Sequence, residues 1–306
     1  MVNMNKKVGI ALGGGAARGL AHIGVLKVLE KHKIPLKYIA GTSMGAIIGG
    51  FFAAGVSADE LEGFALALKG KKVLKFFTPS WSYSGFINGK NIVTYLNTLM
   101  PDRDIQSLPI QFSAVATDFF TGKKFVIEKG SLWNAFRASS SIPVIFSPTV
   151  CGSKILLDGG LSAPLPTAVV KDMGADIVIS VNVVPPPEYK KNIKRKKSLM
   201  DNIAAKMNNW SLLPLKKSGG YLVNIDFSGK KRILPSVINI SMQTRNIIEY
   251  NLIIMDVKTN KPDFLLQPNK DVTVGWFEFD RAKEIIENGE KSAMKIVDRL
   301  IEIINS

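Results

Sequence analysis

A serine between two glycines is the first residue of the chain whose setting suggests chemistry. The pentapeptide Gly41-Thr42-Ser43-Met44-Gly45 has the GxSxG pattern, which forms a nucleophile elbow where a strand precedes it and a helix follows. Glycines are needed two residues before and after the serine, because side chains there would collide with so tight a turn. The serine is held in a strained conformation at a helix amino terminus, which favours developing negative charge. The pattern predicts Ser43 as a nucleophile; the alternative is a glycine-rich turn with a helix-capping serine.

A second group of glycines lies in Gly13-Gly14-Gly15-Ala16-Ala17-Arg18-Gly19. Glycines between a strand and a helix leave backbone N–H groups free to point at an anion. A dinucleotide fingerprint needs glycines at offsets zero, two and five, but from Gly13 the third place is Arg18, and from Gly14 the second is Ala16. A triphosphate loop ends in Gly-Lys-Ser/Thr, which this segment lacks. The interpretation that is left is an oxyanion hole beside an activated serine.

A serine nucleophile usually has a histidine base. The two histidines, His22 and His32, both precede the serine, whereas α/β-hydrolases place theirs late in the chain. We therefore expect His22 to be a packed helix residue and His32 a surface residue. The segment Asp158-Gly159-Gly160 offers another base, because an aspartate at a strand end can turn toward a site at the carboxyl edge of a sheet. A plain turn aspartate is the alternative, and Asp118 is a rival that no glycine pair follows.

The elements that must position these residues follow from apolar patterning. Runs rich in β-branched and aromatic residues predict strands, and helical spacing of apolar residues follows both glycine motifs. Strands alternating with helices predict a three-layer α/β/α fold with a mostly parallel central sheet. Amphipathic residues from Ala293 to Ile304 predict one closing helix docked on the core. The expected strands are Val8–Leu12, Lys37–Ala40, Ile110–Ala116, Phe125–Glu128, Lys154–Leu157 and Ile177–Val183.

The 306 residues are expected to form a single domain in three parts. The core runs over 6–185, an insert over about 186–232 and a C-terminal helical part over 233–306. The insert opens on Pro185-Pro186-Pro187 and continues with six lysines or arginines among residues 189–197. Its apolar residues Leu199, Ile203, Met207 and Trp210 would share one face of a helix. The segment 189–213 can bind an anionic membrane surface, or it can be a solvated loop with a helix packed on the core.

Charge and cysteine content limit the binding partners and the cellular compartment that the sequence predicts. Lysine and arginine number 40 against 25 aspartates and glutamates, and the net charge of +15 predicts attraction to polyanions. Cys151 is the single cysteine, so an internal disulfide is excluded, and no metal-ligand cluster is evident. Residues 38–58 carry no charge, but five glycines favour a buried strand-turn-helix over a membrane span. We expect a cytoplasmic protein, associated peripherally with a membrane if the insert binds lipid.

Together the motifs resemble the patatin-like phospholipase family, whose glycine-rich loop, GxSxG elbow and Asp-Gly-Gly turn occur in this order. The resemblance covers roughly Val8 to Val184. It extends to Leu20–Leu26 and Ala138–Pro143, and the tail segment Gly275–Asp280 is also similar to that of bacterial members. One departure is Ala16, because the family often has glycine there and alanine does not easily adopt a positive φ angle.

The resemblance implies a patatin-like fold and a serine-dependent lipid acyl hydrolase: a phospholipase, lysophospholipase or carboxylesterase. It implies a Ser43–Asp158 dyad in place of a triad, a lipid ester substrate and no cofactor or metal. Two alternatives stay open, a basic nucleic-acid-binding protein and a non-catalytic membrane-binding regulator on the same fold, although no nucleic-acid-binding motif supports the first. The sequence does not define an oligomeric state. The implied oxyanion loop is Gly13, Gly14, Gly15 and Ala16 with Arg18 in support, and the motif-supporting glycines are Gly19, Gly41, Gly45, Gly159 and Gly160.

Overall fold

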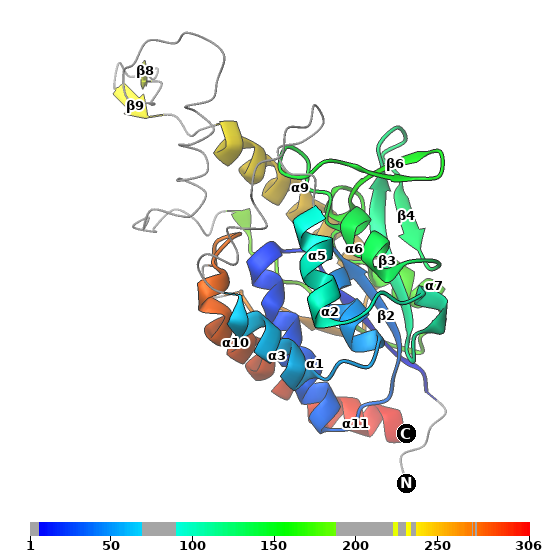
Figure 1. Cartoon of the computed structure of the whole chain (residues 1–306). Coiled ribbons are helices and arrows are strands. Elements are labelled where there is room, and N and C mark those ends of the chain that lie inside the picture. The colour runs from blue at the N-terminus through cyan, green and yellow to red at the C-terminus, as the bar shows by residue number, and fades with distance from the viewer. Residues whose placement is uncertain are drawn as a thin grey trace.

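The computed structural model describes residues 6–68, 90–187, 223–225, 231–233, 237–270, 272 and 274–306. Helices cover both faces of a central sheet (Figure 1), which confirms the expected three-layer α/β/α fold. The strands are β1 (Val8–Leu12), β2 (Leu36–Thr42), β3 (Gln111–Asp118), β4 (Lys124–Ile127), β5 (Thr149–Cys151), β6 (Lys154–Asp158), β7 (Ile177–Val181), β8 (Val223–Ile225), β9 (Lys231–Ile233) and β10 (Phe264–Leu266). The α-helices are α1 (Ala21–Lys31), α2 (Met44–Ala53), α3 (Ala58–Ala67), α5 (Lys90–Leu99), α6 (Leu132–Ser139), α7 (Thr167–Asp172), α9 (Val237–Asn260), α10 (Ala282–Met294) and α11 (Val297–Asn305).

The central sheet is mixed. Its strand order is β10-β7-β1-β2-β3-β6-β5, with β4 paired to β3. The pairs from β10 to β3 are parallel, whereas β4, β6 and β5 pair antiparallel. The expectation of a mostly parallel sheet thus holds for the half that carries the glycine motifs. Short turns join β3 to β4 and β5 to β6, so these two pairs are antiparallel, because parallel neighbours need a long crossover. The β3–β6 pair is also antiparallel, although β4, α6 and β5 lie between these strands in the chain.

Each face of the sheet has its own packing partner, because side chains alternate along a strand. On β1, Ile10 and Leu12 belong to the large core cluster that also contains residues of α1, α2 and α10. Ala11 belongs to a smaller cluster with Val170 of α7. A Cβ on Gly9 would overlap the Val170 side chain, so α7 lies very close to this strand. Burial on both faces explains the apolar runs from which the strands were predicted.

Two strand ends meet on one edge of β3. The last residue of β2, Thr42, pairs with Val115 in parallel register. The last residue of β6, Asp158, pairs with Ala116 in antiparallel register. Because β4 occupies the opposite edge of β3 over residues 114–117, β2 and β6 must share one edge. Their carboxyl ends therefore meet head to head, and the residue after Thr42 comes next to Asp158.

The prediction of one closing helix is wrong. The helix α10 ends at Met294, and α11 begins at Val297 after a turn at residues 295–296. The bend lets both helices bury an apolar stripe, including Ala293 on α10 and Leu300 on α11. The C-terminal part is also not purely helical, because β10 joins the central sheet beside β7.

The uncharged stretch over residues 38–58 forms β2, a turn and α2, as expected. Within the described residues, no helix combines the length and the hydrophobicity that a membrane crossing requires. The basic run 189–197 and the possible helix through Leu199 and Trp210 lie outside the described residues. Of the expected insert, the structure describes the short antiparallel pair of β8 and β9.

Two glycines allow α1 and α10 to cross at close range. A Cβ on Gly24 would overlap the Ile286 carbonyl, and a Cβ on Gly289 would overlap the Ala21 carbonyl. Both helices also contribute to the large core cluster. The crossing therefore fixes the C-terminal part of the chain against the helix that follows the glycine loop.

We predict that Gly24→Ala and Gly289→Ala each lower the free energy of unfolding by about 1–3 kcal/mol, because an added Cβ overpacks the crossing. Gly63→Ala is the matched control, since a Cβ at this exposed position of α3 meets no atom within 4 Å. It should raise the free energy of unfolding by about 0.5–1 kcal/mol. Equilibrium denaturation measures all three, and a Gly24→Ala protein as stable as wild type would contradict the crossing.

Candidate active site

Ser43 occupies the turn between β2 and α2 in a conformation that non-glycine residues rarely adopt, with φ 55° and ψ −118°. Hydrogen bonds hold the turn in place. The Ser43 N–H donates to the Ser139 hydroxyl at 2.8 Å, and that hydroxyl donates to the Val115 carbonyl at 2.6 Å. The Ser43 carbonyl accepts the Ala46 N–H at 3.0 Å, which begins α2. The strained residue is thus tied to both the sheet and the following helix.

The two motif glycines lie where a side chain has no room. A Cβ on Gly41 would overlap the Gly45 carbonyl, and a Cβ on Gly45 would overlap the Leu12 carbonyl at the end of β1. Gly19 is similarly close to the Met44 side chain. The steric reason for a glycine at both of these positions of the GxSxG pattern therefore applies in this fold.

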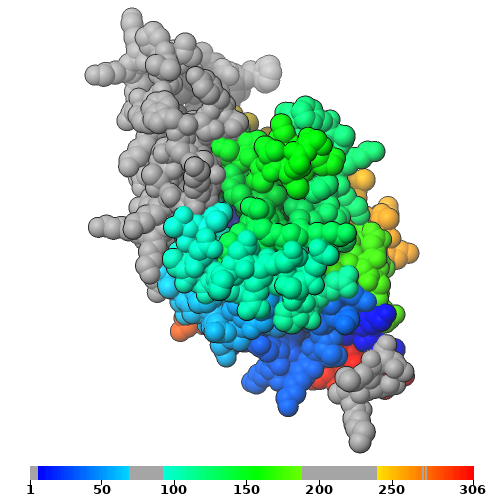
Figure 2. All heavy atoms as spheres, turned by 45° about the vertical axis from the view of Figure 1, so that its right-hand side comes forward, coloured from blue at the N-terminus to red at the C-terminus, as the bar shows by residue number. Residues whose placement is uncertain are grey.

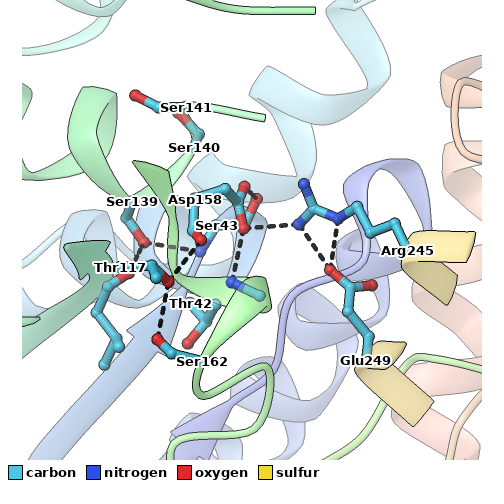
Figure 3. A network of polar contacts seen from close by, with 12 residues as sticks. Thr42, Ser43, Thr117, Ser139, Ser140, Ser141, Asp158, Ser162, Arg245 and Glu249 are labelled. Carbon is cyan, nitrogen blue, oxygen red and sulfur yellow. Dashed lines mark hydrogen bonds and ion pairs between the residues drawn. The ribbon is translucent and has the colours of Figure 1, made fainter. Parts of the chain in front are cut away.

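Ser43 and Asp158 are in direct contact (Figure 3). The Ser43 hydroxyl donates to Asp158 Oδ2 at 2.8 Å, in a setting where Ser43 is 4% exposed and Asp158 is fully buried. The other carboxylate oxygen, Oδ1, accepts the Gly160 N–H at 2.7 Å and Arg245 Nη2 at 2.6 Å. The Thr117 hydroxyl donates to the Asp158 carbonyl at 2.9 Å. One oxygen of Asp158 therefore faces the serine while the other is held by two donors.

The glycines after Asp158 make room for two neighbouring elements. A Cβ on Gly159 would overlap the Val115 carbonyl of β3. A Cβ on Gly160 would overlap the Glu249 carboxylate on α9. Close approach of β3 and α9 thus adds a steric reason for the Asp-Gly-Gly sequence.

The rival Asp118 has different partners. Its carboxylate accepts Lys154 Nζ at 2.7 Å and the N–H groups of Phe120 and Thr121 at 3.0 Å each. The hydrogen bond from Lys154 and those from the turn lower the pKa of Asp118 to about 2. Asp118 is therefore a turn aspartate with an ion pair, and no hydrogen bond joins it to Ser43.

The two histidines also have other roles in the described structure. His22 is fully buried, and its Nε2 donates to the Gly13 carbonyl at 2.7 Å. Burial lowers the pKa of His22 to about 4, so the ring is neutral at pH 7. His32 lies at the carboxyl end of α1, where its Nδ1 is 2.8 Å from the Val28 carbonyl oxygen. Among the described residues, neither ring hydrogen-bonds Ser43.

The amides of the glycine loop divide into two groups. The N–H of Gly13 donates to the Val181 carbonyl at 3.1 Å, and that of Gly14 donates to the Pro164 carbonyl at 2.9 Å. The Gly15 and Ala16 N–H groups have no acceptor among the described residues. Ala16 adopts φ 50°, the positive angle that is unfavourable for alanine. The loop thus offers two unengaged amides rather than four.

Arg18 supports this loop from the buried side. Its Nε donates to the Gly15 carbonyl at 3.3 Å, and its Nη1 donates to Asn246 Oδ1 at 3.1 Å. The guanidinium lies 4.9 Å from the ring centre of Trp276. Burial lowers the pKa of Arg18 to about 10, which leaves the side chain charged at neutral pH. Arg18 therefore fixes the carbonyl next to the unengaged amides.

An apolar cavity of about 170 Å³ opens beside Ser43. Ala16 and Ser43 line one part of it, so a ligand there would meet the serine and the loop together. Its volume is close to that of an engineered apolar cavity of about 150 Å³ that takes up benzene. The apolar lining includes Ile47, Phe51, Leu61, Phe64, Leu96 and Phe146.

Sequence reasoning missed the residues of α9 at this site. Arg245 and Glu249 lie four residues apart on one helix face, and Arg245 Nε donates to Glu249 Oε1 at 2.6 Å. The only available signal was their helical spacing, which exposed surface pairs share. Ser139 lies in a segment singled out by resemblance, but its bond to the Ser43 amide was not foreseen. Within the described residues, no group of three or more acidic, histidine or cysteine side chains could hold a metal ion.

His22 generates a prediction about stability and pH. Its folded-state pKa is about 4 against 6.5 in the unfolded chain, so the unfolded state binds more protons below pH 6.5. The contribution of His22 to the free energy of unfolding is fully present above pH 6.5 and is lost as the pH falls toward 4. The His22→Gln variant keeps an N–H donor for Gly13 but cannot titrate. Denaturation at pH 7 and pH 5 should show that wild type loses about 2 kcal/mol more than this variant; equal losses would contradict a buried neutral histidine.

Comparisons with known proteins give the chain its family. The chain is 38% identical over 177 residues to an uncharacterised NTE family protein of Mycobacterium tuberculosis, covering 58% of this chain and 49% of that protein. It is 33% identical over 185 residues to Lysophospholipase NTE1 of Debaryomyces hansenii, covering 58% of this chain and 12% of that protein. The matches thus span about half or less of these curated relatives. The solved structure of VipD from Legionella pneumophila aligns with a TM-score of 0.48 and 12% identity, over 97% of this chain and 67% of VipD. A model of the patatin-like phospholipase family matches residues 10–171, and the chain belongs to that family.

Proposed function

We propose that the protein is a serine-dependent lipid acyl hydrolase in which Ser43 is the nucleophile and Asp158 the base. The observation that carries the proposal is the 2.8 Å hydrogen bond from the Ser43 hydroxyl to Asp158 Oδ2 at the wall of an apolar cavity. A carboxylate is a weak base at neutral pH, so it must be within hydrogen-bond reach of the hydroxyl that it deprotonates. This contact meets that requirement.

The reaction would proceed in two steps. Asp158 accepts the proton of Ser43 as its Oγ attacks the ester carbonyl, and then passes that proton to the leaving alcohol. A water molecule attacks the acyl-enzyme, again with Asp158 as base, and releases the fatty acid and free Ser43. The unengaged amides of Gly15 and Ala16 are the best candidates to bind the oxyanion, because those of Gly13 and Gly14 already donate to carbonyls.

The apolar cavity supports a lipid substrate. Its lining suits an acyl chain, and Ser43 and Ala16 lie where the carbonyl of such a chain would be placed. The relative from Debaryomyces hansenii is named a lysophospholipase, which supports phospholipids or lysophospholipids as the ester class. We propose one of these as the substrate, with its acyl chain in the cavity.

We further propose that the enzyme binds a membrane peripherally, through the edge of the sheet at which Ser43 lies. The exposed fraction is 54% for Phe119 and 73% for Phe120, and the centroids of their two rings lie 5.1 Å apart. They follow β3, which is parallel to β2, so they leave the sheet at the same edge as Ser43. Figure 2 shows green atoms at one end of the coloured surface and blue atoms at the opposite end. Exposed Lys123 and the net charge of +15 would attract anionic lipid.

We predict that folded Ser43→Ala and Asp158→Asn variants lose activity by on the order of 10⁴-fold or more toward short-chain p-nitrophenyl esters and phospholipid vesicles. Asp158→Asn keeps the shape of the side chain but cannot accept the proton. A Ser43→Ala variant that keeps its rate would overturn the central proposal, and an active Asp158→Asn variant would place the base elsewhere.

Salt-dependent DNA binding by a wild-type protein without esterase activity would favour a nucleic-acid-binding protein, and vesicle binding without turnover would favour a regulator.

The membrane proposal predicts that the double variant Phe119→Ser/Phe120→Ser binds phosphatidylglycerol vesicles at least about tenfold more weakly, since it loses two aromatic groups that would enter the interface. Hydrolysis of a soluble ester should be unchanged. Met294→Ser is the control, because Met294 is 51% exposed but lies at the end of α10. Vesicle sedimentation with equal binding by all three proteins would contradict this surface.

A further inference from the structure

Four charged side chains are buried together behind the Ser43–Asp158 pair. Arg245 Nη2 lies 2.6 Å from Asp158 Oδ1 and 2.6 Å from Glu249 Oε1. Arg18 and Arg245 lie 4.9 Å and 5.2 Å from the ring centre of Trp276, so both guanidinium groups contact one indole. Arg18, Asp158 and Glu249 are fully buried, and Arg245 is 7% exposed. The two cations and two carboxylates balance, as burial in a medium of low dielectric requires.

Arg245 is held more firmly than a single ion pair would hold it. Its Nε and its Nη2 both lie 2.6 Å from Glu249 Oε1, and Nη2 also donates to Asp158 Oδ1. The space beside Gly160 is filled by Arg245 and Glu249, since a Cβ there would overlap both. The helix α9 therefore presents its guanidinium to Asp158 in one geometry.

This geometry has two opposite effects on a carboxylate that must accept a proton. A donor on Oδ1 directs Oδ2 toward Ser43, which benefits the proton transfer. A cation at 2.6 Å also attracts the negative charge that the carboxylate gives up when it takes a proton. Glu249 opposes the second effect while it is ionised, because it shares the same guanidinium. Burial raises the pKa of Glu249, so this opposing charge is lost as the pH falls.

We propose that Arg245 is a positioning residue that fixes Asp158 for Ser43, and that Glu249 offsets its charge so that Asp158 still accepts a proton. This inference rests on the acyl hydrolase function proposed above. Neither residue lines the apolar cavity, so both act through Asp158 and not through the acyl chain.

The other charged groups near Asp158 have partners elsewhere in the described structure, so Arg245 is its direct charged contact and Glu249 reaches it through Arg245. On β3 and β6, Asp118 and Lys154 pair with each other. His22 on α1 bonds the Gly13 carbonyl and is neutral at pH 7. Arg18 lies on the loop side, where it bonds Gly15 and Asn246. The groups that reach Asp158 Oδ1 are the Gly160 amide and Arg245.

The test compares the pH dependence of kcat/KM for a soluble ester in wild type, Glu249→Gln, Arg245→Gln and the double variant. Activity needs the Asp158 carboxylate. Removing the nearby anion in Glu249→Gln should move the acid limb to lower pH by about 1 unit, and removing the cation in Arg245→Gln should move it to higher pH by a similar amount. The double variant restores the charge balance, so its acid limb should return near that of wild type. Its plateau rate should stay about 10²-fold low, because Asp158 is no longer fixed.

Arg245→Lys is the conservative variant and keeps the test valid if Arg245→Gln does not fold. It retains the charge, so the acid limb should stay near that of wild type, while kcat falls and KM is unchanged because the cavity is intact. Circular dichroism and thermal melting establish that each variant is folded. Folded variants whose acid limbs stay at the wild-type pH, or move in the same direction, would overturn the inference and leave Arg245 and Glu249 with a structural role only. A wild type that hydrolyses no ester would instead remove the proposed function, and this inference with it.

Discussion

The meeting of two strand ends on one edge of β3 is the constraint on which the site depends. β2 arrives from one direction and ends opposite Val115, and β6 arrives from the other and ends opposite Ala116. A parallel sheet alone would bring Ser43 to its carboxyl edge, as in other α/β proteins. It would not bring the end of a second strand against it, so the antiparallel half of the sheet is what places Asp158 within 2.8 Å of the serine.

The C-terminal part of the chain belongs to the site as much as to the scaffold. Arg245 and Glu249 come from α9, and Trp276 follows β10, which extends the sheet beside β7. The Trp276 carbonyl accepts the Ala17 N–H at 3.0 Å, so this segment also holds the glycine loop. A buried charge needs a partner and hydrogen bonds to be tolerated. The C-terminal part thus supplies the charged partner that keeps Asp158 buried next to the apolar cavity.

The sequence could nominate Ser43 and Asp158 because their signals are local: a glycine pattern around one and a glycine pair after the other. It could also predict a layered fold, because the strands and helices differ in period. The sequence could not predict whether β6 runs parallel or antiparallel to β3, because the composition of Lys154–Leu157 is the same for both directions. The pairing of Asp158 with Arg245 was equally hidden, because it joins residues 87 positions apart. For the same reason, the sequence could not show that the Gly13 and Gly14 N–H groups donate hydrogen bonds to the Val181 and Pro164 carbonyls.

The strain at the site follows from the same arrangement. Ser43 and Ala16 both have positive φ angles, 55° and 50°, and each lies shortly after a parallel strand, β2 for one and β1 for the other. Such conformations persist only where the surroundings impose them. Ser139 and α2 impose the angle on Ser43, and Arg18 fixes the Gly15 carbonyl before Ala16. Both residues line the apolar cavity, so the two strained positions of the backbone border the same space beside Ser43.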